Sequence, residues 1–332
     1  MSEIVTLRHG DGGLYTNRLI QEVFAPHFHN EVLAAYQDAA IVTTDANRLA
    51  FTTDSFVVKP IFFPGGDIGK LAVCGTVNDL AAAGARPLFL SAGFVIEEGF
   101  EIENLKRIAK SMSDVCQAVG AKIVAGDTKV VDKGLVDGVF INTSGIGSVH
   151  EFFQPRQIAP GDEIILTGTI AEHGTVILLE RHDLGLQGDF ASDCAPLSEI
   201  IAVLGDDMRH IKLMRDPTRG GVATALCEMA ESNRIGAVVE EERLPIRPAV
   251  KAVHELLGTD PLYFACEGRM LIVAERGFGK VILQRLRRLD NYKNATIIGA
   301  FDRPFGKVFL RTALGGERIL PMLENQMISR IC

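Results

Sequence analysis

Residues 64–87 constrain the fold of this chain most, because a glycine turn leads into a small-residue segment of helical length. The sequence there is PGGDIGKLAVCGTVNDLAAAGARP. Gly65 and Gly66 predict a loop before the helix, and the final Arg-Pro predicts its end. Backbone N–H groups are free at a helix start, where anions bind well. Lys70 and Asn78 are polar within an otherwise apolar surface, so the segment fits either a nucleotide-phosphate site or an ordinary buried helix.

Five aspartates share a setting that suits a metal ion bound beside phosphate: Asp54, Asp67, Asp79, Asp127 and Asp216. Each lies after a loop or near a helix start, next to small or hydroxyl-bearing residues. Magnesium requires oxygen ligands in octahedral geometry and keeps phosphate and water in its shell. Carboxylates from several loops meet that requirement. The alternative for any one of these aspartates is a turn former or a helix cap.

No stretch of the chain matches a standard phosphate-binding loop. The sequence PGGDIGKL lacks the required spacing, and Leu71 follows Lys70 where a magnesium-binding hydroxyl is needed. The sequence DPTRGG at residues 216–221 is more suggestive, because it places an acid, Arg219 and Gly220 at a helix start. That combination suits a phosphate, and a capped helix start explains it nearly as well.

Three further residues are candidates for chemistry. Lys129 follows Gly-Asp-Thr in an apolar neighbourhood, where it could steady phosphate charge or transfer a proton, or could be a solvated lysine at a strand end. Glu267, in FACEGRM, is either a partly buried general base or a turn acid. Cys332 is the final residue of the sequence. A thiol on a mobile tail can travel between sites, but the sequence around it favours an incidental cysteine over a functional one.

Composition excludes several classes of function. A net charge of −8 argues against nucleic acid or an anionic membrane as the main partner. The start of the chain is no signal peptide, and no apolar run is long enough to span a bilayer. The six cysteines include no Cys-x-x-Cys pair, which argues against a disulfide framework or structural zinc and fits a reducing cytoplasm.

Breaks in the residue pattern divide the chain into four parts. We expect a partly flexible N-terminal segment at 1–38, a first domain at 39–152, a second α/β domain at 153–315, and a mobile tail at 316–332. Strands and helices alternate in both domains without a strict βαβ rhythm, and this predicts an α+β fold with two mixed sheets. Within the first domain, residues 122–125 are expected to form a short buried strand.

Several motifs together resemble those of one protein family. They are TTDSFVVKP, FFPGGDIGKLAVCGTVNDLAAAGARP, SAGFVIEEG, VAGDTKVV, INTSGIG, DPTRGG, ELLGTDPLYFACEGR and the terminal Arg-Ile-Cys. Along nearly its whole length the chain resembles the HypE family of carbamoyl dehydratases, which are hydrogenase maturation factors. GDTKVV with a terminal Arg-Ile-Cys separates this family from relatives such as aminoimidazole ribonucleotide synthetase and selenophosphate synthetase. Ser329 departs from the usual proline, and Asp11 from the more frequent glycine.

The resemblance implies a fold like that of aminoimidazole ribonucleotide synthetase, with an N-terminal domain that binds ATP and pairs into a homodimer through a shared β-barrel. The carbamoyltransferase HypF would place a carbamoyl group on the terminal cysteine, and ATP would drive its dehydration to a thiocyanate. The cyanide would pass to a HypC–HypD complex and become an iron ligand of nickel–iron hydrogenase. The alternatives are a sister synthetase or kinase that acts on a free small molecule, and an adaptor that binds nucleotide as a switch.

The motifs and the resemblance also assign roles to individual residues. Magnesium is expected on Asp54, Asp67, Asp79 and Asp216. ATP is expected to contact Gly65, Gly66, Lys70, Asn78, Gly126, Asp127, Thr128, Arg219 and Gly220. Lys129 and Glu267 are expected to serve in proton transfer and charge stabilisation. Cys332 would carry the carbamoyl group, delivered by the tail.

Overall fold

The structure is a computed structural model that describes residues 14–19, 21, 38–43, 48–182, 184, 186, 188–324 and 328–332. Asp11 and the glycine cluster around it lie outside these residues. The short helix α1 covers Leu14–Leu19. None of the helices in these ranges is long and apolar enough to cross a membrane.

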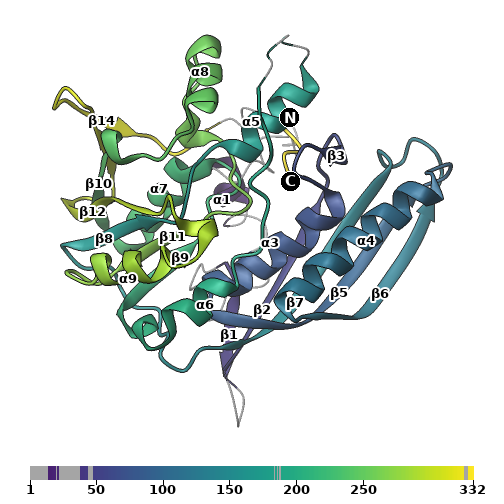
Figure 1. Ribbon diagram of the computed structural model, residues 1–332, viewed down its shortest axis with the longest axis horizontal. Helices are drawn as coiled ribbons and strands as arrows, with labels where there is room; N and C mark the ends of the chain where they lie inside the picture. Colours follow the sequence, from purple (N-terminus) through teal and green to yellow (C-terminus); the bar gives the residue numbers. More distant parts are fainter. Residues whose placement is uncertain are drawn as a thin grey trace.

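The first domain is a five-stranded sheet with two helices against one face (Figure 1). The sheet order is β1-β2-β7-β5-β6, in which only the β5–β6 pair is parallel. The strands are β1 Ala40–Thr43, β2 Arg48–Phe56, β5 Ala85–Glu97, β6 Lys122–Val131 and β7 Val139–Val149. The covering helices are α3 Ile68–Ala82 and α4 Ile102–Val119, and a small ladder pairs β3 Phe62–Phe63 with β4 Gly66–Asp67.

Helix α3 is buried around almost its whole circumference, which explains why its sequence is rich in small apolar residues. The Asp67 side chain caps its first turn by accepting from the N–H groups of Gly69 and Lys70 at 2.8 and 2.9 Å. A Cβ at Gly69 would lie 2.5 Å from the Ile108 carbonyl oxygen, so glycine permits the close approach of α4. Such a helix is held by its neighbours on all sides rather than by one apolar stripe.

The opposite face of this sheet carries exposed apolar side chains. Phe51, Phe89 and Ile146 on β2, β5 and β7 are 47%, 45% and 38% exposed. The edge strand β6 is exposed over nearly its whole length. The expectation of a buried strand at 122–125 is therefore wrong for the single chain, because the apolar residues of β6 have no layer covering them.

The second domain is a seven-stranded sheet of order β14-β13-β10-β12-β8-β11-β9, antiparallel except for the β10–β13 pair. The strands are β8 Asp162–Leu166, β9 Ile211–Arg215, β10 Ile235–Glu240, β11 Leu271–Ala274, β12 Thr296–Pro304, β13 Val308–Arg311 and β14 Glu317–Leu320. The helices are α5 Glu172–Arg181, α6 Glu199–Leu204, α7 Gly221–Asn233, α8 Pro248–Leu257 and α9 Gly279–Leu286. Short 3-10 helices cover Gly205–His210, Glu241–Arg243, Pro261–Tyr263 and Asp290–Tyr292.

Helices lie on both faces of the second sheet. Ile164 and Leu166 of β8 pack in one apolar cluster with α7, while Ile165 packs in another with α6 and α9. This split follows from the alternation of side chains along a strand. Both sheets contain parallel and antiparallel pairs, so the predicted α+β class with mixed sheets is confirmed.

The end of the chain contains regular structure within the segment expected to be a tail, residues 316–332. Residues 317–320 form strand β14, which pairs with β13 and buries Leu320. Ile328 and Ile331 are buried in an apolar cluster to which both domains contribute. The C-terminus therefore lies close to β3 rather than beside β14 (Figure 1).

Candidate functional site

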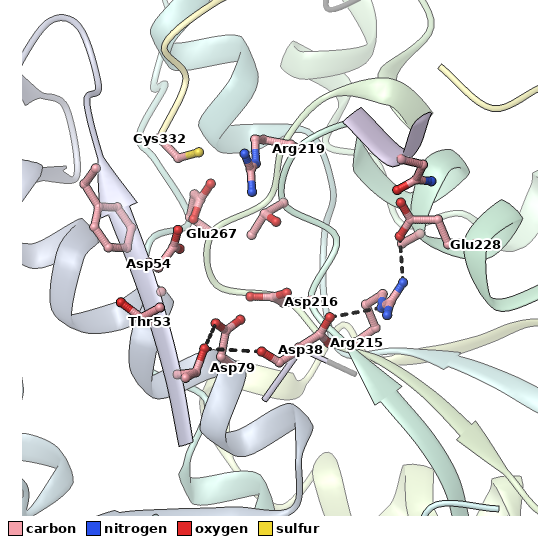
Figure 2. A pocket seen from close by; sticks show the side chains of 16 residues that line it. Asp38, Thr53, Asp54, Asp79, Arg215, Asp216, Arg219, Glu228, Glu267 and Cys332 are labelled. Atoms are coloured by element: carbon pink, nitrogen blue, oxygen red, sulfur yellow. Dashed lines mark hydrogen bonds and ion pairs between the residues drawn. The ribbon is translucent and has the colours of Figure 1, made fainter. Parts of the chain in front are cut away.

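A cavity of about 320 Å³ lies between the two domains, and six of its sixteen lining residues are acidic (Figure 2). One wall comes from β2 and α3, and the other from the ends of β9 and the start of α7. The lining residues are Asn17, Asp38, Thr52, Thr53, Asp54, Phe56, Gly75, Asp79, Arg215, Asp216, Thr218, Arg219, Ala225, Glu228, Glu267 and Cys332. Residues far apart in the sequence therefore meet around one cavity.

Strand β2 and helix α3 bring the first acidic groups together. Alternate side chains of a strand share a face, so Thr52, Asp54 and Phe56 lie on the side that α3 covers. The Thr52 hydroxyl donates to Asp79 Oδ2 on α3 at 2.7 Å. A Cβ at Gly75 would lie 2.7 Å from the Phe56 ring, so this glycine allows the strand and the helix to approach closely.

The acidic groups of the cavity perturb one another strongly. Burial raises the pKa of Asp79 well above its ordinary value, and the charges of Asp216, Asp54 and Asp38 raise it further. The pKa of Asp216 is raised for the same reasons, first by burial and then by Asp38 and Asp54. Burial likewise raises the pKa of Glu267 well above its usual range. Such a cluster is unfavourable until a cation reaches it, which is typical of a binding site.

Two arginines supply the positive charge of the cavity. Arg215 contacts Asp38 Oδ1 at 3.1 Å and Glu228 Oε2 at 2.6 Å. Burial alone would lower the pKa of Arg215, but Asp38 and Glu228 raise it, so the guanidinium stays charged. The pKa of Arg219 is raised most by Cys332 in its ionised form, and further by Asp54 and Glu267. Arg215 is thus held by two carboxylates, and Arg219 faces Cys332.

Cys332 lines this cavity because the last residues of the chain, 328–332, pack against the body of the protein. Figure 2 shows its sulfur directed toward Arg219, with Glu267 and Asp54 on the neighbouring wall. Burial raises the pKa of the Cys332 thiol; Arg219 opposes this shift, whereas Glu267 and Asp54 reinforce it. The sulfur is therefore protonated at neutral pH in this arrangement.

Glu267 is held at both ends of its main chain. Its N–H donates to Asp193 Oδ1 at 3.2 Å, and its carbonyl oxygen accepts from Asn78 Nδ2 at 3.1 Å. Asn78 also donates to the Ala195 carbonyl and accepts from the Leu197 N–H. Among the described residues, Glu267 Oε1 has no hydrogen-bond partner although it is buried. A fixed loop thus presents an unused carboxyl oxygen to the cavity.

The structure brings together six of the predicted site residues: Asp54, Asp79, Asp216, Arg219, Glu267 and Cys332. Gly220 adjoins them at the N-cap of α7, where its positive φ of 76° favours glycine. Asn78 does not line the cavity. Its side chain instead bonds to main-chain groups of Ala195, Leu197 and Glu267, and so links α3 to the second domain.

Other predicted residues lie away from the cavity. Asp67 is buried as the cap of α3, where its Oδ1 also accepts from the Ser111 hydroxyl at 2.6 Å. Lys70 Nζ donates to the Gly65 carbonyl at 2.8 Å, which holds the glycine turn, including Gly66, against the helix. The turn supports α3, and the structure does not bring it to the acidic cluster.

The GDTK sequence lies on the exposed edge strand β6. Gly126, Asp127, Thr128 and Lys129 are all exposed there, and Lys129 Nζ contacts Asp127 Oδ1 at 2.8 Å. Neither charged group lines the cavity of its own chain. Within a single chain Lys129 is therefore separate from the cavity. It could contribute to a site only where a second protein surface packs against the exposed sheet face that carries β6.

Sequence reasoning missed Asp38, Arg215 and Glu228. Arg215 immediately precedes Asp216, so the strand end could have been considered as a pair of charged residues. Glu228 lies two turns into α7, in a stretch of small and apolar residues that is buried along most of its length. Asp38 follows a segment without clear periodicity, and no sequence signal connects it to the other two.

The residue types of the cavity fit a hard divalent cation. In the described part of the chain, no group of three or more His, Cys, Asp or Glu side chains is already arranged to hold a metal ion. However, Asp54 and Asp216 both raise the pKa of Asp79, and Asp38 Oδ2 is buried without a hydrogen-bond partner in those same ranges. A cation that shares its shell with phosphate oxygens would offset this repulsion.

Comparison with known proteins agrees with the two-domain architecture. Residues 36–149 match the AIR synthase related protein, N-terminal domain, and residues 159–307 match the AIR synthase related protein, C-terminal domain. The carbamoyl dehydratase HypE of Rhodobacter capsulatus is 47% identical, over 99% of this chain and 98% of that protein.

Solved structures are similar over the same length. A HypE–HypF complex includes a chain with 46% identity and a TM-score of 0.87, which covers 92% of this chain and 99% of its own length. A hydrogenase maturation protein HypE in complex with ATP is 40% identical with a TM-score of 0.82, over 99% of this chain and all of that one. With both domain models and full-length relatives in agreement, this chain belongs to the HypE family of carbamoyl dehydratases.

Proposed function

We propose that this protein uses ATP to dehydrate a carbamoyl group carried on Cys332, giving a thiocyanate, ADP and phosphate. The observation that supports this most is the position of the Cys332 sulfur, which shares one cavity with Glu267, Arg219 and four aspartates. A relative named carbamoyl dehydratase and a relative solved with ATP agree with a nucleotide-driven reaction at this cavity. The product would supply cyanide for the iron centre of nickel–iron hydrogenase.

The reaction needs ATP because a carbamoyl oxygen is a poor leaving group. Transfer of the γ-phosphoryl group to that oxygen forms a C–O–P linkage and releases ADP. The C–O bond then breaks, its electron pair leaves with phosphate, and two protons leave the nitrogen to form S–C≡N. Phosphoryl transfer depends mainly on positioning and charge stabilisation, which a fixed, charged cavity can provide.

Glu267 and Arg219 have complementary roles in this proposal. A raised pKa makes the Glu267 carboxylate a stronger base once it is deprotonated, so it can accept an N–H proton beside Cys332. The Arg219 guanidinium faces the sulfur and can stabilise negative charge on the carbamoyl oxygen or on the transferred phosphoryl group. Both groups are in place before any substrate binds.

Magnesium would be held by Asp54, Asp79 and Asp216, with Asp38 as a further oxygen donor. When bound, the ion would neutralise charge on the ATP phosphates and orient them. Asp67 is omitted from this set, because its Oδ1 is engaged with two main-chain N–H groups and a hydroxyl.

A homodimer would cover the exposed face of the first sheet. Phe51, Phe89 and Ile146 form an apolar surface there, which in water favours association. Asp127 and Lys129 lie on the same sheet, so pairing of two copies would bring the GDTK sequence into an enclosed interface. In that arrangement Thr128 and its neighbours could reach bound ATP, and Lys129 could contribute to charge stabilisation.

The partners follow from the same chemistry. HypF would donate the carbamoyl group, in line with the solved HypE–HypF complex of a relative. A HypC–HypD complex would accept the cyanide. All six cysteines are free thiols, five of them buried, which suits a reducing cytoplasm.

The proposal is tested by the mass of the intact protein and of its C-terminal peptide. The protein would be incubated with the carbamoyltransferase and carbamoyl phosphate, and then with Mg-ATP. We expect a carbamoyl adduct on Cys332 that loses one water only after ATP is added. The Cys332→Ala variant should remain folded and unmodified.

Two outcomes would contradict the proposal. Carbamoylation of Cys332→Ala at another residue would remove the assigned carrier. An unmodified Cys332 with continued ATP hydrolysis would instead favour a sister enzyme that acts on a free small molecule.

A further inference from the structure

The last residues of the chain are held by an array of hydrogen-bond donors. Four consecutive main-chain oxygens, from Ser329 to Cys332, each accept a hydrogen bond from the body of the protein. The Arg181 guanidinium donates to the Ser329 and Arg330 oxygens. The Val57 N–H donates to the Cys332 oxygen at 3.0 Å. These contacts involve main-chain oxygens and leave the Cys332 sulfur uncovered by them.

His173 completes this array with a donor of fixed direction. Its Nε2 lies 2.7 Å from the Ile331 oxygen, which can only accept, so Nε2 carries the proton. Its Nδ1 lies 2.8 Å from the Ser192 hydroxyl, and that hydroxyl already accepts from the Cys194 N–H. The Ser192 hydroxyl still has its proton to donate, so it can donate to Nδ1 of a neutral imidazole. This agrees with the pKa of His173, which burial lowers.

Side chains add a second layer of contacts. Ile331 is only 5% exposed and packs in the apolar cluster to which both domains contribute. Arg330 donates to the Val57 carbonyl at 2.8 Å and contacts Asp137 at 2.7 Å. Arg330 also adopts a positive φ of 50°, a conformation that a non-glycine residue keeps only when its surroundings hold it.

The same array is connected to Glu267. The Asp193 carboxylate accepts from the His173 N–H at 3.1 Å and from the Glu267 N–H at 3.2 Å. The helix start that holds the tail and the loop that carries Glu267 therefore share one buried anchor. Cys332 is fixed relative to Glu267 through this connection.

We propose that His173 and Arg181 are positioning residues, which bind the carbonyl groups of residues 329–331 and thereby set the Cys332 sulfur beside Glu267 and Arg219. This inference rests on the proposed dehydration at Cys332. Because the contacts avoid the sulfur, they hold the tail equally well whether Cys332 carries a thiol, a carbamoyl group or a thiocyanate. They also explain why serine is accepted at position 329, since proline and serine offer the same carbonyl oxygen.

The first measurement is the rate at which iodoacetamide alkylates Cys332 in the full-length protein, read from the mass of the C-terminal peptide. Arg181→Ala and His173→Phe should each raise this rate by about tenfold or more, because each removes a donor from the tail. Arg181→Lys and His173→Gln keep one donor and should fall between these variants and the wild type. Glu180→Ala, at the exposed neighbouring position on α5, is the control and should stay within about twofold.

The second measurement is single-turnover dehydration of carbamoylated protein at saturating Mg-ATP. Arg181→Ala should slow this step by about tenfold or more with an unchanged dissociation constant for ATP, because the sulfur is displaced while the nucleotide site is intact. Ser329→Pro should match the wild type in both measurements. If the wild type does not dehydrate the adduct, the proposed function fails, and the alkylation rates still decide whether the tail is held as described.

Alkylation rates of Arg181→Ala within about twofold of the wild type would overturn the proposal. So would faster alkylation with an unchanged dehydration rate, because the contacts would then hold the tail without serving the reaction. His173 is fully buried, so circular dichroism and thermal melting accompany its variants. Arg181 is only partly buried, and its variants alone decide the outcome if those of His173 do not fold.

Discussion

At Asp79 a carboxyl group is buried on α3 beside Asp54 and Asp216, and burial is the largest cause of its raised pKa. An unfolded chain ionises this group at its ordinary pKa of 3.8, whereas the folded chain does so only at higher pH. Below pH 3.8 both states are neutral, so the group is without effect. As the pH rises toward the folded-state pKa, only the unfolded state gains charge, and the ligand-free protein loses stability.

Asp79→Asn should therefore raise the melting temperature of the ligand-free protein, by more at pH 8 than at pH 5. The same variant should lower the rate of magnesium-dependent ATP hydrolysis by about tenfold or more, because an oxygen donor loses its charge. Differential scanning calorimetry and a phosphate-release assay measure the two effects. An unchanged hydrolysis rate would remove Asp79 from the site.

Glu267 offers a second test at a single residue. Glu267→Gln keeps the side-chain volume and the main-chain contacts to Asp193 and Asn78, but it removes the base. We expect dehydration to slow by about a hundredfold or more, with ATP affinity retained. Rapid-quench kinetics with carbamoylated protein measures the rate. A wild-type rate would show that another group accepts the proton.

At the scale of elements, the sequence predicted a helix or strand correctly where its residue pattern fits only one kind of structure. The glycine turn and the small apolar residues of 64–87 predicted helix α3, which is found at Ile68–Ala82. The sequence pattern could not show whether Asp67 caps the helix or binds a metal ion, because an aspartate at a helix start suits both roles. The burial of β6 was predicted wrongly, since a strand with apolar residues has the same sequence whether its covering layer comes from its own chain or from another.

Asp67→Ala distinguishes the cap from the ligand. Loss of the side-chain acceptor should destabilise the protein by about 1–2 kcal/mol, measured by urea unfolding. The magnesium dependence of ATP hydrolysis should stay unchanged, because Asp67 lies outside the cavity. Asp114→Ala, which removes an exposed ion pair on α4, should change stability by less than about 0.5 kcal/mol. A changed magnesium requirement in Asp67→Ala would return Asp67 to the metal site.

At the scale of the whole molecule, the site depends on several segments that are distant in the sequence. Asp54, Asp79 and Asp216 could be chosen from the sequence as acidic residues beside small or hydroxyl-bearing neighbours, although Asp54 lies within β2 and Asp79 in the last turn of α3. Asp38 and Arg215 could not, because only the packing of the two domains brings them together at 3.1 Å. The role of Cys332 as the carrier was predicted from the family resemblance. The contacts that hold the residues before it are visible only in the folded chain.

The exposed face of the first sheet leads to a prediction about assembly. Light scattering should find a homodimer, and Phe89→Glu should shift it toward monomer, because a charge would be buried without a partner. Leu314→Glu, at a residue 99% exposed in the second domain, is the control and should stay dimeric. A wild-type protein that is monomeric at working concentration would contradict the dimer.

The central claim is that the carbamoyl oxygen on Cys332 leaves as phosphate. The most direct measurement loads Cys332 from a carbamoyl donor whose oxygen is the heavy stable isotope, adds Mg-ATP, and analyses the released phosphate by mass spectrometry. The account predicts one heavy oxygen in each phosphate released with a thiocyanate. Heavy oxygen in water, with unlabelled phosphate, would contradict phosphoryl transfer to the carbamoyl group.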